Sequence, residues 1–305
     1  MLKALKALAL GAALAPFLVG SADAHDPHHT AGDGFLVYSA IVELGGGWLS
    51  TSNLQSDADD NIDDSDFGVV EGAARASIPL GSNVSFQFDL DGMHGITARE
   101  KSGDDALQGF FFTSAHLTLR GSSIGALGIL GSYGQSYGGD SDNAQVWFGG
   151  LEVQGYLGPV TLYAQGGYMQ ADDDNEGSVI TNAYWARAAA RVFFTPNARL
   201  QLEAAYTEGE ENDDFDEDVI RGYAAGLRFD HAPGGGPVSY FLGYRGSFIE
   251  NEDNDAQLAD HTGLIGLALR LGAENLRDED RRGATLDTPA WAMGRWTGWS
   301  IDVLD

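Results

Sequence analysis

Hydrophobic and polar residues alternate with a period of two along most of the chain. In residues 199–207, for example, Leu200 and Leu202 fall on one face, while Arg199 and Gln201 fall on the other. An amphipathic helix would need hydrophobic residues at spacings of three and four, and the many glycines would destabilise it. The alternation therefore predicts β-strands. The same pattern recurs in residues 84–91, 238–247 and 265–271.

Two kinds of connection separate these stretches and alternate strictly along the chain. The long acidic connections are residues 55–66, 99–106, 138–144, 171–177, 208–218 and 250–260. The short ones carry glycine, proline or asparagine and are residues 79–83, 121–125, 157–160, 195–199 and 231–237. An even number of antiparallel strands, with short turns at one rim and long loops at the other, is typical of transmembrane barrels. The sequence therefore predicts an all-β fold, a closed antiparallel transmembrane β-barrel of twelve strands.

The predicted strands begin near residues 35, 67, 84, 107, 125, 145, 160, 179, 200, 219, 238 and 262. Over residues 35–272 the chain resembles the Gram-negative porins and small outer-membrane channels, in architecture and without a family-specific motif. An even strand count places both termini at the rim of the short turns, which is the periplasmic side in such barrels. We therefore expect a bacterial outer-membrane protein with two periplasmic termini.

The first 24 residues have the features of a signal peptide. Lys3 and Lys6 form a short positive region, residues 7–20 are apolar, and residues 22–24 supply a small-x-small cleavage site before His25. A membrane anchor is the alternative, but about 14 apolar residues are too few for a helix that needs roughly 20 to span a bilayer. We therefore expect residues 1–24 to be removed on export.

Composition narrows the classes of partner. The chain carries 45 acidic and 17 basic residues, for a formal net charge of -28, which argues against nucleic acid because phosphate binding needs a basic surface. Disorder does not fit either, since 43% of the residues are hydrophobic. The chain has no cysteine, so it forms no disulfides and no thiolate metal sites.

Two all-β interpretations differ in which face of the strands meets water. A soluble sandwich or barrel packs its apolar face inward, whereas a membrane barrel turns that face to lipid. Aromatic residues on the apolar face near the strand ends favour the membrane barrel, because such residues form girdles at the bilayer interfaces. They are Tyr38, Trp48, Tyr133, Trp147, Tyr168, Tyr184, Phe194, Tyr223, Phe229, Tyr240 and Phe248.

Charged residues of the opposite parity should then line the pore. Basic ones gather on the last five strands, and acidic ones on the first three and the sixth, so the two groups would face each other and set up a transverse field. The alternative is that they pair across a narrow interior and fill it. The predicted pore-lining residues are Glu43, Glu71, Arg75, Asp89, Asp91, His116, Arg120, Glu152, Arg187, Arg191, Arg199, Glu203, Arg228, Arg245 and Arg270.

The predicted function is that of a porin-like channel for passive diffusion of small hydrophilic solutes or ions, with no cofactor. The alternative is a non-conducting barrel with structural or adhesive acidic loops. An outer-membrane lipid hydrolase is a third hypothesis, because some barrels of this size are enzymes with a serine and a histidine on the lipid face. His94 has the parity and position for that role, but no serine on the flanking strands shares its face and height, so we expect no enzyme.

Metal binding offers two further hypotheses. The acidic connections 55–66 and 208–218 contain alternating carboxylates, but they lack the glycine and distal glutamate of a calcium-encircling loop. Solvated loops that contact lipopolysaccharide through divalent cations are therefore the favoured interpretation. His25, His28 and His29 could bind a transition metal, although a mobile terminus over residues 25–34 explains them as well. We expect no resident metal.

The last 33 residues, 273–305, do not fit the barrel pattern. They contain Arg277, Arg281 and Arg282, followed by the three tryptophans Trp291, Trp296 and Trp299. This tail could plug the lumen, extend into the periplasm, lie on the membrane, dock a partner, or add strands to give a barrel of fourteen.

Overall fold

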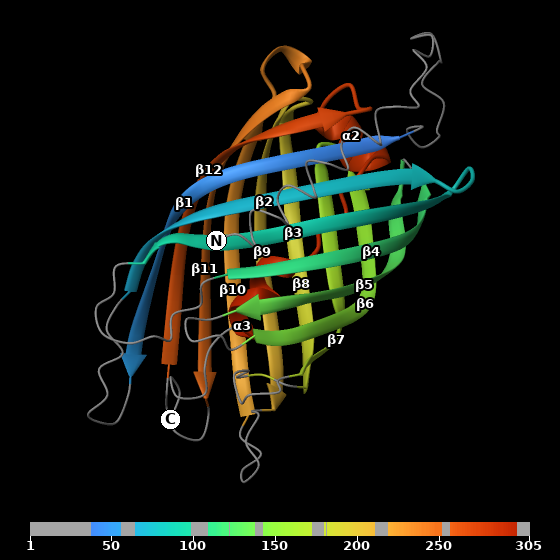
Figure 1. The fold of residues 1–305 in the computed structure, drawn as a ribbon. Helices are drawn as coiled ribbons and strands as arrows, with labels where there is room; N and C mark the ends of the chain where they lie inside the picture. The colour runs from blue at the N-terminus through green and yellow to red at the C-terminus, as the bar shows by residue number, and fades with distance from the viewer. Residues whose placement is uncertain are drawn as a thin grey trace.

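The chain folds into one closed β-barrel (Figure 1). The computed structural model describes residues 38–55, 65–98, 109–121, 123–137, 143–172, 180, 182–210, 219–251 and 257–297. All neighbouring strands are antiparallel, so the predicted fold of twelve antiparallel strands is confirmed. The strands are β1 (Ser39–Gln55), β2 (Ser65–Pro79), β3 (Val84–Ala98), β4 (Gly109–Gly121), β5 (Gly125–Tyr137), β6 (Asn143–Leu157), β7 (Val160–Asp172), β8 (Asn182–Thr195), β9 (Ala198–Glu210), β10 (Val219–His231), β11 (Val238–Asn251) and β12 (Gln257–Leu271).

The first and last strands close the barrel through a long pairing. Ala40 lies opposite Leu271 near one rim, and Ser52 lies opposite Ala259 near the other. Closure matters because unpaired backbone groups at an open sheet edge would be costly in lipid. The closed ladder therefore makes a wall that is complete on its own.

Side chains on the two faces follow the predicted alternation. On β9, Gln201 is 6% exposed and Leu202 is 50% exposed. On β12, Arg270 is 6% exposed and Leu269 is 42% exposed. Charged residues inside and leucines outside are the reverse of a soluble barrel. The inverted orientation predicted for a membrane barrel is confirmed.

Large apolar side chains cover the outer surface. Among them are aromatic residues predicted near the strand ends, including Trp48, Tyr133, Tyr184, Phe194 and Tyr240. An apolar surface of this extent would cause association in water, whereas lipid covers it in a bilayer. The barrel therefore has the surface of a membrane-spanning protein of the outer-membrane type.

Two leucines of β6 provide a test of this orientation. Leu151 lies in the middle of the strand and is 64% exposed, while Leu157 ends it at the rim and is 61% exposed. We expect Leu151→Arg to lower the free energy of unfolding by about 2–4 kcal/mol and Leu157→Arg by about 0–1 kcal/mol, because the cost of a lipid-facing arginine depends on depth. Denaturant unfolding in lipid vesicles measures both variants, and equal losses would contradict the orientation.

The five short turns lie at one end of the barrel, here called the turn rim. The turn between β6 and β7 has only two residues, and Gly158 adopts a φ of 58°, in the left-handed region that favours glycine. The acidic connections join strands at the opposite end, the loop rim. They fall largely within residues 56–64, 99–108, 138–142, 173–179, 211–218 and 252–256, which lie outside the described residues.

The chain turns back into the barrel after β12. Gly272 has a φ of 91°, and a Cβ there would lie 2.1 Å from the carbonyl oxygen of Tyr38, so the reversal requires glycine. The following residues 273–297, here called the lumenal segment, form α2 (Leu276–Arg282) and α3 (Ala290–Trp296) inside the ring of strands (Figure 1). Trp296 and Arg295 are fully buried. The described part of the tail thus adds helices and no strand, which leaves the count at twelve rather than fourteen.

None of the helices in the described part of the chain is long and apolar enough to cross a membrane. Residues 1–37 and 298–305 lie outside the described residues. The predictions of a signal peptide over 1–24, of a mobile terminus over 25–34 and of two periplasmic termini therefore remain predictions.

Candidate functional site

All fifteen predicted pore-lining residues point into the interior of the barrel, where they are buried or half-buried. The strands place them because every second side chain of a strand lies on the same face. Most of them lie in the half of the barrel next to the turn rim: Arg199 and Arg270, for example, lie one residue from the ends of their strands. Glu71, Asp91, Arg187 and Arg245 lie near the middle of theirs. This half of the lumen is therefore rich in charge.

The basic and acidic walls touch rather than face each other across an open space. Arg228 of β10 donates to Glu43 of β1 at 2.6 Å, and Arg245 of β11 donates to Glu71 of β2 at 2.6 Å. Arg270 also contacts Glu43, at 3.5 Å. The expected transverse field across an open pore is thus wrong for this conformation, because the opposed charges form ion pairs that neutralise one another.

His116 lies at the centre of a second polar cluster. Its ring nitrogens lie 3.1 Å from Glu152 and 3.2 Å from Asp89, and all three side chains are buried. Tyr163 donates to Glu152 at 2.5 Å, and Thr288 of the lumenal segment donates to Asp89 at 3.1 Å. The cluster therefore connects the wall to the segment through hydrogen bonds.

The first helix of the lumenal segment, α2, is anchored at the turn rim. Asn275 caps it by accepting a hydrogen bond from the backbone nitrogen of Asp278 at 2.9 Å. Asp280 pairs with Arg191 at 2.6 Å, and Glu279 pairs with Arg270. These contacts place two acidic side chains of the segment against the basic side of the barrel.

Residues 284–289 connect the two helices, and wall side chains hold their backbone. The Gln87 side chain donates to the carbonyl oxygen of Leu286 at 2.6 Å and accepts from its backbone nitrogen at 3.3 Å. Gln165 donates to the carbonyl oxygen of Asp287 at 2.7 Å. The Asp287 carboxylate receives hydrogen bonds from Arg75, Arg187 and Arg191.

The second helix, α3, fills an apolar chamber in the half of the barrel next to the loop rim. Met293 and Trp296 are fully buried there, and a Cβ on Gly294 would lie 2.5 Å from the Phe110 ring. Arg295 is the polar exception and donates to Asp260 at 2.7 Å. The wall of the chamber comprises Leu49, Phe67, Val69, Met93, Phe110, Phe112, Val146, Phe148, Met169, Trp185, Ile220, Ile249 and Leu258.

The interior is therefore charged in one half and apolar in the other. The sequence predicts a pore lined by charged residues, but the interior is apolar in the half next to the loop rim. There the strands carry apolar residues on both faces, as in residues 109–113 and 146–148, and the interior ones pack against α3. This signal was present in the sequence.

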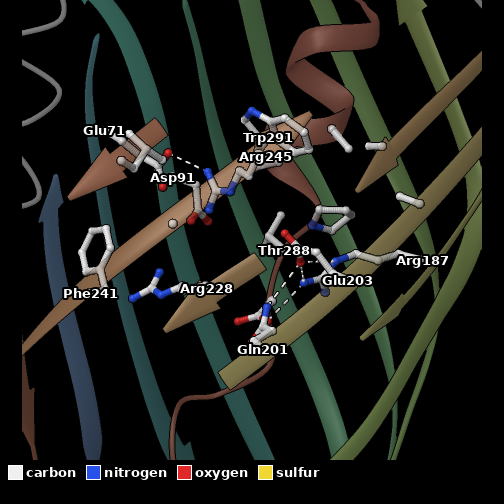
Figure 2. Close-up of a pocket in the computed structure, with 18 of the residues that line it drawn as sticks. Glu71, Asp91, Arg187, Gln201, Glu203, Arg228, Phe241, Arg245, Thr288 and Trp291 are labelled. Atoms are coloured by element: carbon white, nitrogen blue, oxygen red, sulfur yellow. Dashed lines mark hydrogen bonds and ion pairs between the residues drawn. The ribbon is translucent and has the colours of Figure 1, made fainter. Parts of the chain in front are cut away.

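A small cavity remains beside the segment (Figure 2). It has a volume of about 70 Å³ and is bordered by Arg187, Arg228 and Arg245, with Glu71 and Trp291 beside them. At 10–15 Å³ or more for each water, this is room for a few water molecules and not for a path through the barrel. The lumenal segment thus fills much of the described part of the barrel interior.

Several interior acidic residues were missed from the sequence. Asp230 lies two residues from Arg228 on the same face and accepts hydrogen bonds from Arg199, Arg228 and Arg270, so parity alone could have found it. Asp260 was assigned to the connection 250–260. Strand β12 begins at Gln257, however, and the Asp260 side chain points inward and accepts a hydrogen bond from Thr51. Glu279, Asp280 and Asp287 of the lumenal segment lie outside the strands, so parity could not have placed them in the interior.

Two other predicted features lie apart from the lumenal segment. His94 contacts Tyr137, whose hydroxyl lies 3.5 Å from the His94 Nδ1. Among the described residues, no group of three or more histidine, cysteine or acidic residues could hold a metal ion. His25, His28 and His29, and most of the acidic connections, lie outside the described residues, so contact with lipopolysaccharide or cations stays a prediction.

No protein-family model matches the sequence, and no curated protein matches it. Among solved structures, the barrel is similar to the COG4313 outer membrane channel from Pseudomonas putida F1, with a TM-score of 0.54 and 14% identity over 81% of this chain and 100% of that one. The translocator domain of the autotransporter NalP from Neisseria meningitidis gives a TM-score of 0.47 and 14% identity, over 88% and 97%. A Pseudomonas aeruginosa FadL homologue gives a TM-score of 0.40 and 9% identity, over 77% of this chain and 90% of that one. The similarity to the first of these supports what the geometry shows, a closed β-barrel with the fold of bacterial outer-membrane barrels.

Proposed function

We propose that the protein is an outer-membrane channel for small solutes that is closed by its own lumenal segment. The observation that carries the proposal is that the wall is complete without the segment: β1 pairs with β12, and residues 273–297 add no strand. A wall that closes by itself can keep its shape when its contents move. The segment joins β12 at the turn rim, so it would withdraw through that rim.

The contacts of the segment favour a closed state that opens rarely. Burying a large apolar side chain such as Met293 or Trp296 contributes about 1.5–3 kcal/mol each, so α3 is held firmly. The charged contacts of α2 and Asp287 cost less to separate, because water can hydrate both partners once they part. We therefore expect brief openings from a mostly closed channel.

The two halves of the lumen indicate what could pass. Ion-paired side chains line the half at the turn rim and would interact with the small hydrophilic solutes predicted from the sequence. The apolar chamber around α3 would accommodate an apolar part of a solute once the helix has left. The two halves together fit a small solute with one charged group and one apolar part.

A substitution in α3 tests the proposal. Because a Cβ on Gly294 would collide with the Phe110 ring, we expect Gly294→Leu to displace α3 and to raise the open probability in planar-bilayer recordings. The control is Gly263→Leu, since nothing lies within 4 Å of a Cβ at Gly263. The control should record like the wild type.

The filled lumen also favours the alternative of a non-conducting barrel. Heat-modifiable gel mobility identifies correctly folded protein before recording. If folded wild type and folded Gly294→Leu both fail to conduct, the channel proposal is wrong and the alternative stands.

A further inference from the structure

Three arginines converge on one carboxylate inside the barrel. Arg75 of β2 donates to Asp287 Oδ1 at 3.2 Å, while Arg187 and Arg191 of β8 donate to Oδ2, the former at 3.3 Å. Arg191 is fully buried and Arg187 is 7% exposed. Both carboxylate oxygens are therefore bound by charged donors from two separate parts of the wall, which gives strong and oriented hydrogen bonds.

The surroundings fix the arginines in place. The Tyr163 ring lies under two of them, 5.7 Å from the Arg187 guanidinium and 5.4 Å from that of Arg191. Gln165 donates at once to the Tyr163 hydroxyl, at 2.7 Å, and to the Asp287 carbonyl oxygen. Arg187 also donates to the Gln165 side-chain oxygen at 3.0 Å, so Tyr163 and Gln165 contact the two β8 arginines from the wall side.

The charge balance of the pocket changes when the segment leaves. Arg187 keeps Glu203 as a partner, and Arg75 keeps Asp91 at 3.7 Å. Arg191 pairs with Asp280 and Asp287, and both belong to the segment. An open lumen would therefore present Arg191 and its neighbours as an anion-binding site.

We propose that Arg75, Arg187 and Arg191 form a binding site for the carboxylate group of a solute, and that Asp287 occupies this site in the closed state. The identity of the ligand as a passing solute rests on the proposed function. Because Asp287 and a solute carboxylate exclude each other, the solute binds only the open state and shifts the equilibrium toward it. The closing segment and the solute thus compete for the same three arginines.

Chemical rescue tests the site without any transport. The full-length Asp287→Ala variant keeps the three arginines but lacks the Asp287 carboxylate. Formate is a carboxylate small enough to fill the space that this group leaves. We expect the variant to unfold at a lower temperature than the wild type, by heat-modifiable mobility in detergent, and formate to recover most of the loss. Chloride at equal ionic strength should recover little, and the wild type should not respond to formate beyond the chloride control.

The matched control is Asp287→Asn, which loses the charge but fills the space, so formate should give no rescue. If Asp287→Ala does not fold unaided, its refolding yield with formate against chloride provides the same comparison, and Asp287→Ser provides a second variant. Equal effects of formate and chloride on Asp287→Ala and Asp287→Ser would overturn the proposal. Because the experiment measures stability and not current, a failure of the carboxylate site can be distinguished from a failure of the channel proposal.

Discussion

A disulfide between positions 136 and 297 should abolish conductance through the barrel, and a reductant should restore it. Ser136 of β5 and Thr297 are both buried, and their hydroxyl oxygens lie 2.7 Å apart. Two sulfur atoms bond at about 2.05 Å, so a small adjustment lets Ser136→Cys and Thr297→Cys join. The chain has no cysteine of its own to interfere.

The disulfide should block opening because it fixes the second end of the lumenal segment. The first end is already covalently joined to β12 through Gly272 at the turn rim. With Thr297 bonded to β5 near the loop rim, residues 273–297 are held at both ends and cannot withdraw. Passage that depends on their departure is then impossible.

Planar-bilayer recording with alternating oxidant and reductant measures this effect in one protein sample. The single variant Thr297→Cys is the control and should not respond to the oxidant. If the oxidised double variant conducts as well as the reduced one, solutes pass without withdrawal of the segment, and the closing role assigned to it is wrong.

The wall of this barrel could be predicted from the sequence because strand geometry is local. A period of two fixes the face of every side chain, so Arg191 and Glu152 were placed inside from parity alone. Turn chemistry did the same for the connections: the two-residue turn at Gly158 lies where glycine and proline predicted it. Twelve strands follow from counting such turns.

The contents of the barrel could not be predicted in the same way. Parity says that Arg228 and Glu43 point inward, but it does not say that two side chains separated by 185 positions meet across the interior. That distance depends on the barrel diameter and on what else fills the lumen. The transverse field across an open pore was inferred without knowing the barrel diameter or the contents of the lumen.

The lumenal segment illustrates the limit of local signals. The chain from Asn275 onward has a capping residue, acidic residues in the first turn and basic residues in the last turn, which together favour the helix α2. Nothing local indicates that α2 lies inside the barrel. Its place follows from complementary charges on distant strands, such as Arg270 for Glu279 and Arg191 for Asp280.

Removing the Arg191 guanidinium should have the largest energetic effect of any single substitution considered for this chain. Arg191 is fully buried and holds both Asp280 and Asp287. Arg191→Met keeps much of the volume but leaves buried carboxylates without their main partner, which costs about 3–5 kcal/mol. For comparison, Arg221 pairs with Glu208 at the surface, so Arg221→Met should cost about 0–1 kcal/mol.

The cost should fall on the closed state and not on the wall. Both abandoned carboxylates belong to the lumenal segment and regain water when it withdraws, whereas Arg191→Met leaves every strand pairing in place. We therefore expect a higher open probability, together with trypsin cleavage after Arg295, which is fully buried in the closed state. Mass spectrometry of the digest detects that cleavage, and Arg221→Met should remain resistant. A variant that loses barrel mobility on gels would show that Arg191 stabilises the wall, and a variant that keeps this mobility with Arg295 still protected would show that Arg191 does not hold the lumen closed.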